Sequence, residues 1–196
     1  GSATTSLCVY EEGRLSHIAV FPVGCGHVTN DLAIGLKTSI EAAEAVKISF
    51  GYAVSKNVSS RDLIELAKID SQSKNSVSRR FVSEIIEIRM AEILEWVNNE
   101  LKHIGKAGKL PAGVVLVGGG AKMPGLVDLT KLELRLPAQI GVSDLSHFEI
   151  SNVDLNTELE DPEYACCLGL LLWGKEHSPG RYASINLPLG GWFKKV

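Results

Sequence analysis

Apolar residues recur along the first part of this chain with the two-residue period of β-strands. Two β-rich runs, residues 6–10 and 15–21, are separated by a polar turn that contains Gly13, and this pattern predicts a β-hairpin. A break at residues 24–26, with glycine at both ends, precedes residues 29–31, which can cap or start a short helix. We therefore expect a hairpin that leads through a glycine-bounded loop into a helix.

A second helix is predicted after Ser39, whose hydroxyl can cap it, and it is expected to end near Gly51. Alanines between these positions favour the helix. Residues 54–78 are polar and rich in serine apart from residues 63–69, so we expect one or two short strands there with exposed connections. We interpret this polar region as a small lobe inserted into the main domain.

The second half of the chain alternates between helical and strand patterns. Apolar side chains at three- and four-residue spacings predict one long helix over residues 78–102. A strand at 113–117, a helix at 123–133 and a short strand at 138–140 are expected next, and this alternation is typical of an α/β layer. A final helix that begins at Asp161 is apolar almost all round, and we expect it to pack in the core.

The strand at 113–117 runs directly into three glycines, Gly118, Gly119 and Gly120. Because glycine has no Cβ and can adopt positive φ, this backbone can lie against a flat base or ribose. The helix that follows can offer unpaired N–H groups to such a ligand. The same pattern also occurs in tight connections that bind nothing, and the motif alone does not decide between the two.

The overall composition narrows the classes of function. The chain has 196 residues, of which 45% are hydrophobic, and a net charge of −3, which gives no reason to expect nucleic-acid binding. Its longest apolar run, residues 166–173, is far shorter than the roughly 20 residues of a membrane-spanning helix. The five histidines lack the spacing of a helical metal pair, so we assign no metal ligand. Gly1-Ser2 resembles the remnant of a purification tag, and we expect that the chain begins within a longer protein.

The segment of residues 27–47, HVTNDLAIGLKTSIEAAEAVK, resembles the FtsA family of bacterial cell-division proteins within the actin-like ATPase superfamily. Residues 84–89, 118–121, 162–165 and 169–171 agree with the same family in the same order. The resemblance covers nearly the whole chain and corresponds to the second domain of these proteins. It implies an α/β fold of the actin-like (ribonuclease H-like) type, with a mixed sheet, flanking helices and a small inserted α/β lobe.

The same resemblance divides the chain into subdomains. Residues 1–37 and 81–190 would form subdomain IIA, the nucleotide-binding lobe, and residues 38–80 would form the inserted subdomain IIB. Residues 191–196 would begin the C-terminal linker and membrane-targeting segment, since aromatic residues followed by lysines suit the start of an interfacial amphipathic helix. This short stretch supplies little apolar area, so we expect no stable membrane binding by the chain itself.

The resemblance also implies a site for ATP and Mg²⁺ in the full-length protein. The glycine motif would hold the adenosine, and Glu44 and Lys47 would reach the ribose and adenine from the other lobe. Taken without the family, Glu44 and Lys47 are better explained as an exposed ion pair three residues apart. The residues that the resemblance assigns to the nucleotide are Thr4, Thr5, Glu44, Lys47, Gly118, Gly119, Gly120 and Ala121.

The phosphate side of this site departs from the family pattern. The second phosphate loop of the family usually starts with an aspartate that helps to organise Mg²⁺, and Gly1-Ser2 stands where that aspartate should precede. The first phosphate loop and the whole first domain have no counterpart. We therefore assign no catalytic residue, and expect a weak ATPase in the parent protein but weak ATP binding and no measurable hydrolysis by this chain.

Subdomain IIB of the family also captures the C-terminal tail of FtsZ, the tubulin-like GTPase of the division ring. By resemblance, Arg89 matches the contact arginine most directly, Arg79 and Arg80 can pair with the acidic tail, and Glu92 can accept from peptide N–H groups. The alternative explanation is a solvated charged helix face.

The function that the resemblance implies is that of an actin-like ATP-binding adaptor, which polymerises and tethers FtsZ filaments to the cytoplasmic membrane. Such a protein would be cytoplasmic and peripheral on the inner face of the membrane at the division site. An actin-like pilus-assembly or cell-shape ATPase is the first alternative. A sugar- or acetate-type kinase of the same superfamily is the second.

Overall fold

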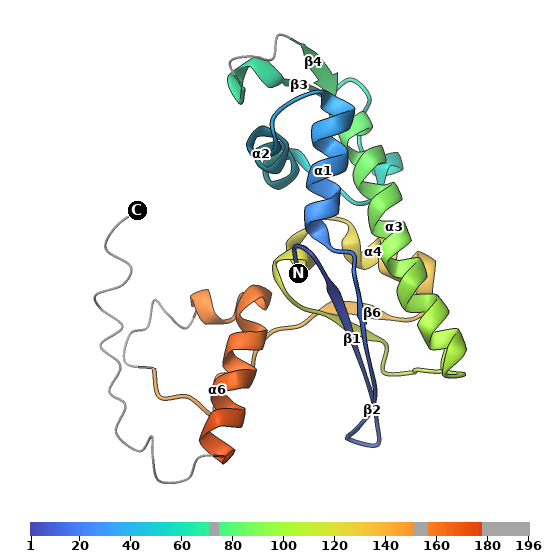
Figure 1. Cartoon of the computed structure of the whole chain (residues 1–196), viewed down its shortest axis with the longest axis vertical. Helices are drawn as coiled ribbons and strands as arrows, with labels where there is room; N and C mark the ends of the chain where they lie inside the picture. Colours follow the sequence, from blue (N-terminus) through green and yellow to red (C-terminus); the bar gives the residue numbers. More distant parts are fainter. Residues whose placement is uncertain (71–74, 151–156, 178–196) are drawn as a thin grey trace.

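The computed structural model of this protein describes residues 1–70, 75–150 and 157–177. Its helices and strands follow the order predicted from the sequence (Figure 1). The strands are β1 (Thr5–Glu11), β2 (Arg14–Phe21), β3 (Leu63–Glu65), β4 (Ser76–Ser78), β5 (Val114–Leu116) and β6 (Ala138–Ile140). The α-helices are α1 (Cys25–Leu36), α2 (Ile40–Phe50), α3 (Arg79–His103), α4 (Leu126–Leu134) and α6 (Ala165–His177). Short 3-10 helices are η1 (Ser55–Asn57), η2 (Leu66–Lys68), η3 (Gly119–Lys122) and η4 (Pro162–Tyr164).

The strands pair as neighbours. β1 and β2 form the predicted antiparallel hairpin, whose tip has left-handed backbone at Glu12 and Gly13, with φ of 50° and 76°. β3 pairs with β4 in antiparallel orientation, and β5 pairs with β6 in parallel. Both kinds of pairing are therefore present in this α/β fold, but in the described residues they form three separate two-stranded sheets.

Helix α1 begins earlier than predicted. It starts at Cys25, with Gly24 as the cap, instead of at residues 29–31. The carbonyl oxygens of Gly1 and Ser2 accept hydrogen bonds from the backbone N–H groups of Cys25 and Gly26, at 2.9 and 2.8 Å. These bonds satisfy first-turn donors that a helix otherwise leaves unpaired, so no side-chain cap is needed and the helix extends to the glycine break.

Helices α2 and α3 begin where the sequence indicates. The Ser39 hydroxyl accepts a hydrogen bond from the N–H of Ala42 at 3.2 Å, and the Ser78 hydroxyl accepts one from the N–H of Phe81 at 3.1 Å. Both are N-cap bonds of the kind that serine favours. The prediction of α2 up to Gly51 and of one long helix from residue 78 is confirmed.

The core lies where α1, α2, α3 and α4 meet. α1 packs against both α2 and α3, and α3 packs against α4. The side chains in this region that are almost completely buried include Val28, Leu32, Val46, Val82, Ile86, Leu101 and Leu129. α2 and the β3–β4 hairpin lie at the end of the molecule remote from the β1–β2 hairpin (Figure 1). The division into residues 38–80 and the remainder stays a prediction.

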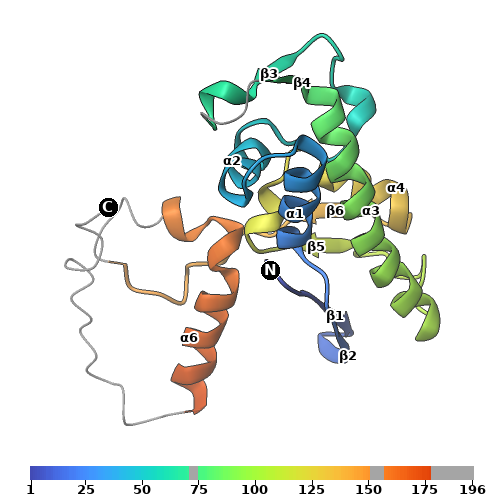
Figure 2. The same cartoon turned by 45° about the horizontal axis from the view of Figure 1, so that its top comes forward.

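The prediction that the last helix packs in the core is wrong. Within α6, Leu168 is buried, but Leu170, Leu171 and Trp173 are 69%, 57% and 61% exposed. The helix stands to one side of the other elements in both views (Figures 1 and 2). The stretch 191–196 lies outside the described residues.

Candidate functional site

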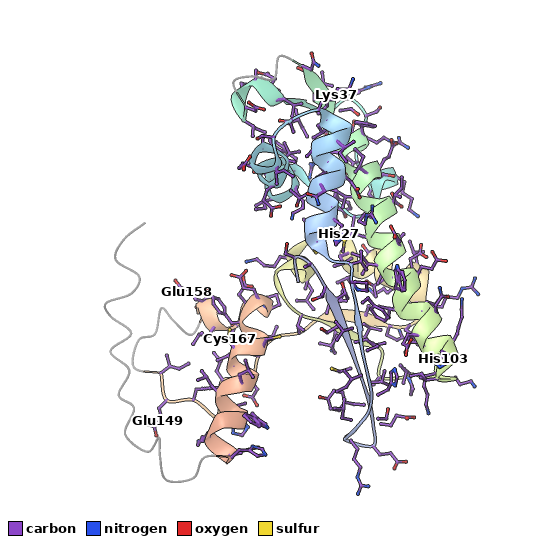
Figure 3. The ribbon with its side chains drawn as sticks, in the orientation of Figure 1. His27, Lys37, His103, Glu149, Glu158 and Cys167 are labelled. Atoms are coloured by element: carbon purple, nitrogen blue, oxygen red, sulfur yellow. The ribbon has the colours of Figure 1, made fainter. Side chains whose placement is uncertain are left out.

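A cleft of about 1010 Å³ opens at the N-terminal end of α1. His27, which lines it, lies at this end of the helix, and Lys37 marks the opposite end (Figure 3). Residues from α2, the glycine turn and the start of the chain complete the walls. Its polar and glycine lining residues include Thr29, Glu44, Lys47, Gly119, Gly120, Lys122 and Glu163.

The Lys47 ammonium is the centre of a polar network on one wall of this cleft. Its Nζ donates to Glu44 Oε2 at 2.7 Å, to Thr29 Oγ1 at 2.9 Å and to the carbonyl oxygen of Cys25 at 3.4 Å. The Thr29 hydroxyl in turn donates to Glu44 Oε2 at 2.5 Å. Thus Glu44 and Lys47 do form the i, i+3 ion pair, but its ammonium is mostly buried and is tied to α1 through Thr29.

The ionised form of Glu44 is favoured by this network. Partial burial raises the pKa of the carboxyl group, but the hydrogen bonds from Lys47 and Thr29 and the nearby positive charge outweigh it, so the pKa lies below its ordinary value. Both bonds use Oε2, and the described residues give Oε1 no hydrogen bond. Glu44 therefore presents a charged oxygen that can accept from a ligand hydroxyl.

The glycine turn also lines the cleft, through Gly119 and Gly120. Among its three glycines, Gly118 has a positive φ, 88°, and a Cβ there or at Gly119 would meet open space or at most the tip of Glu163. A Cβ on Gly120 would instead lie 2.5 Å from Cys25 Sγ, so this glycine allows the turn to pack closely against α1. The turn continues as η3, and the helix predicted from residue 123 begins only at Leu126.

The structure brings only part of the predicted nucleotide set into the cleft lining. Glu44, Lys47, Gly119 and Gly120 line it, whereas the other four residues do not. Gly118 precedes the wall, and Ala121 is 3% exposed and faces the interior. Thr4 is exposed outside the lining, and the Thr5 hydroxyl donates to the carbonyl oxygen of Val23 at 2.8 Å. At the start of the chain, Ser2 and Ala3 line the cleft in place of Thr4 and Thr5.

Sequence reasoning missed a charged group on the glycine side of the cleft. Lys122 Nζ lies 2.6 Å from Asp161 Oδ2 and 3.6 Å from Glu163 Oε2, and the hydrogen bond to Asp161 raises the pKa of the lysine. The N–H of Gly118 also donates to the carbonyl oxygen of Pro162 at 2.7 Å. Lys122 directly follows the glycine motif, and this position was the one signal in the sequence that could have placed it at the cleft. Its acidic partners lie about forty residues further along the chain.

Arg89 forms a second polar cluster, between α1 and α3. Its Nε donates to Asp31 Oδ2 at 2.6 Å, its Nη2 to Asp31 Oδ1 at 3.1 Å, and its Nη1 to Glu92 Oε2 at 2.5 Å. The hydrogen bond to Asp31 and the two negative charges outweigh burial and raise the pKa of Arg89. The sequence indicated Arg89 and Glu92, which the structure brings together, but not Asp31.

Arg79 and Arg80 lie at the first turn of α3 and do not join the Arg89 cluster. Arg79 Nε donates to the carbonyl oxygen of Phe50 at 2.9 Å, which ties α3 to the end of α2. Arg80 forms an exposed pair with Glu84, with Nε and Oε1 3.4 Å apart. The four residues predicted to bind a partner therefore form one cluster and two separate positions on the same helix.

No helix in the part of the chain that the structure describes is both long enough and apolar enough to cross a membrane. In the same part of the chain, no group of three or more His, Cys, Asp or Glu residues is placed to hold a metal ion.

Comparisons with known proteins show the family. Residues 1–169 match the family model described as "Cell division protein FtsA". The chain is 32% identical over 187 residues to the cell division protein FtsA of Pseudomonas aeruginosa, covering 95% of this chain and 43% of the relative. It is 37% identical over 150 residues to that of Bacillus subtilis, covering 74% of this chain and 34% of the relative. The chain thus spans less than half the length of these relatives.

The fold is shown independently by a solved structure. MreB 5 of Spiroplasma citri, in a crystal structure described as bound to AMPPNP, superposes with a TM-score of 0.64 at 17% identity. The superposition covers 89% of this chain and 50% of the MreB chain. The α/β fold is therefore that of the actin-like ATPases.

Proposed function

This chain belongs to the cell division protein FtsA family, and on that basis we propose that it is the second domain of an actin-like adaptor that binds ATP and connects FtsZ filaments to the cytoplasmic membrane. The proposal rests above all on one observation: Glu44 and Lys47 of α2 line the same cleft as Gly119 and Gly120 of the family's adenosine motif. In this assignment the protein acts in assembly, and ATP biases its conformation.

The cleft fits an adenine nucleotide. Its volume of about 1010 Å³ is at the upper end of the usual range for ligand sites. The backbone at Gly118 and Gly119 leaves room for a flat base or ribose, Glu44 Oε1 can accept from ribose hydroxyls, and Lys47 can donate to the base or the sugar. Bound ATP would supply contacts to both domains of the parent protein, and ligands held between lobes favour domain closure.

The phosphate and Mg²⁺ side is proposed to be completed outside this chain. That Thr4 and Thr5 bind the phosphates stays a prediction. Both residues directly follow Ala3, which lines the cleft. We propose that Mg²⁺ arrives with the phosphates, since the described residues provide no carboxylate cluster for it. We accordingly expect weak ATP binding and no measurable hydrolysis by the chain alone, with any ATPase activity of the parent protein weak.

The partner of the α3 surface is proposed to be the C-terminal peptide of FtsZ, with Arg89 as the main contact and Glu92, Arg79 and Arg80 as supporting positions. Self-association into filaments and attachment through a C-terminal amphipathic helix, of which residues 191–196 would be the start, complete the proposal. The protein would then act on the inner face of the cell membrane at the division site. Membership of the FtsA family argues against the pilus-assembly, cell-shape and kinase alternatives.

The adaptor role predicts direct binding of the FtsZ tail by this chain. Fluorescence anisotropy of a labelled FtsZ C-terminal peptide, titrated with the chain, is expected to show saturable binding that weakens with added salt, because exposed charges are screened. A scrambled peptide of the same composition is the control. The absence of binding at millimolar protein would remove the partner assignment and leave the nucleotide cleft as the remaining part of the proposal.

A further inference from the structure

Helix α1 contacts both the nucleotide cleft and the Arg89 cluster. Near its N-terminal end, the carbonyl oxygen of Cys25 and the hydroxyl of Thr29 accept from the Lys47 ammonium. Two residues after Thr29, the Asp31 carboxylate holds two nitrogen atoms of Arg89. The two proposed binding sites are therefore joined by a few residues of one rigid helix.

At the cleft, α1 is connected to α2 through one buried hydroxyl group, that of Thr29. Thr29 is 4% exposed, and its Oγ1 both accepts from Lys47 Nζ and donates to Glu44 Oε2. A ligand that draws Glu44 and Lys47 towards a ribose or base changes both bonds at once. Neighbouring Val28 and Leu32 are completely buried in the core, and the response that fits such packing is a movement of α1 as a body, as helices shift by about 1–2 Å.

The other end of the connection controls how Arg89 presents its donors. A guanidinium carries five N–H groups, and the bonds to Asp31 and Glu92 use one on each of the three nitrogen atoms. Donors on Nη1 and Nη2 remain for a third carboxylate. The two carboxylates, however, outweigh the one positive charge, so Asp31 opposes an acidic ligand while it holds Arg89.

We propose that α1 couples the two sites: a nucleotide that engages Glu44 and Lys47 shifts α1 through Thr29, withdraws Asp31 from Arg89, and thereby strengthens the binding of an acidic peptide at Arg89. The identity of the two ligands in this inference rests on the proposed function. The connection between the two sites through Thr29 and Asp31 of α1 does not. Asp31 acts here as a positioning residue, because it controls the availability of Arg89 through a bidentate ion pair.

The connection is tested first without any ligand, by the exchange rate of the Arg89 Nε–H proton measured by NMR. The Thr29→Val variant keeps the shape of the side chain but loses both of its bonds to Lys47 and Glu44. We expect the exchange rate to rise at least about twofold, in line with couplings measured along packed networks. The Asp31→Asn variant shows how much the exchange rate rises when the ion pair with Arg89 is weakened directly. The Lys47→Met variant removes the bond between Lys47 and Thr29 from the α2 side.

Glu84→Gln is the matched control, because it disrupts an exposed ion pair between Arg80 and Glu84, both of α3, in which no residue of α1 takes part. It should leave the exchange of Arg89 Nε–H unchanged. Equal exchange rates in the wild type, Thr29→Val and Lys47→Met, together with unchanged far-UV circular dichroism, would overturn the coupling.

A second experiment adds the ligands and separates the coupling from the proposed function. The labelled acidic peptide is titrated with and without AMPPNP, and AMPPNP is titrated with and without the peptide. Coupling requires each ligand to tighten the other by the same factor, and Thr29→Val should bring that factor to one. Binding of both ligands without mutual effect would refute the coupling and leave the proposed function intact. Failure of either ligand to bind would count against the proposed function, while the exchange measurement still decides the coupling.

Discussion

Replacing Arg89 by glutamate is expected to abolish the binding of the FtsZ peptide to this chain. The change removes the guanidinium donors and places a third carboxylate beside Asp31 and Glu92, which lie within hydrogen-bonding distance of Arg89 in the wild type. Loss of a hydrogen-bonded charge at an interface costs at least about 2 kcal/mol, or roughly a 30-fold loss of affinity. The same anisotropy titration, with a labelled FtsZ C-terminal peptide, measures it.

Arg14→Glu is the matched control for this experiment. It changes the net charge by the same amount, but Arg14 is exposed at the tip of the β1–β2 hairpin, and this hairpin contacts the C-terminal part of α3, at Glu100, and not the Arg89 cluster. Its affinity for the peptide should stay close to that of the wild type. Equal affinities for the wild type and Arg89→Glu, with both proteins folded, would show that the peptide binds elsewhere.

The second large effect is expected at Leu32, at the centre of α1. Its side chain is completely buried, with 0% exposure, in the cluster where α1 meets the other core helices. Leu32→Ala removes transfer free energy and leaves a cavity, so the free energy of unfolding should fall by about 2 to 5 kcal/mol. Urea denaturation followed by far-UV circular dichroism measures this difference.

Ile34 provides the comparison on the same helix. It is 76% exposed, so Ile34→Ala should change the free energy of unfolding by no more than about 0.5 kcal/mol. A similar loss in both variants would contradict burial as the determinant of the cost, because alanine has the highest helix propensity and cannot destabilise α1 in that way. A negligible loss in Leu32→Ala would show that α1 does not pack in the core as described.

Elements with strong local signals were predictable from the sequence. The apolar spacing of α3 and its serine cap at Ser78 were sufficient because a long amphipathic helix carries its own pattern. The start of α1 was not predictable, since the carbonyl oxygens that satisfy its first N–H groups come from Gly1 and Ser2, distant in sequence. The apolar character of α6 indicated a buried helix, but apolarity does not specify the surface that covers it.

The candidate site shows the same limit. Glu44 and Lys47 were assigned to the site through the family resemblance, since their spacing of one helical turn indicates by itself only an ion pair. Asp31 is separated from Arg89 by 58 residues, and the ion pair exists only because α1 packs against α3. Thr29 was visible in the sequence as a possible helix cap, and its contacts with Lys47 and Glu44 depend on how α1 meets α2.

The assignment of the cleft is most directly tested by NMR mapping of AMPPNP on this chain, because backbone amide shifts detect weak binding residue by residue. We expect saturable shifts at Glu44, Lys47, Gly119 and Gly120, smaller shifts along α1, and none at the tip of the β1–β2 hairpin. Shifts confined to another surface, or none in the cleft at millimolar nucleotide, would contradict the proposal that this half of the protein holds the adenosine.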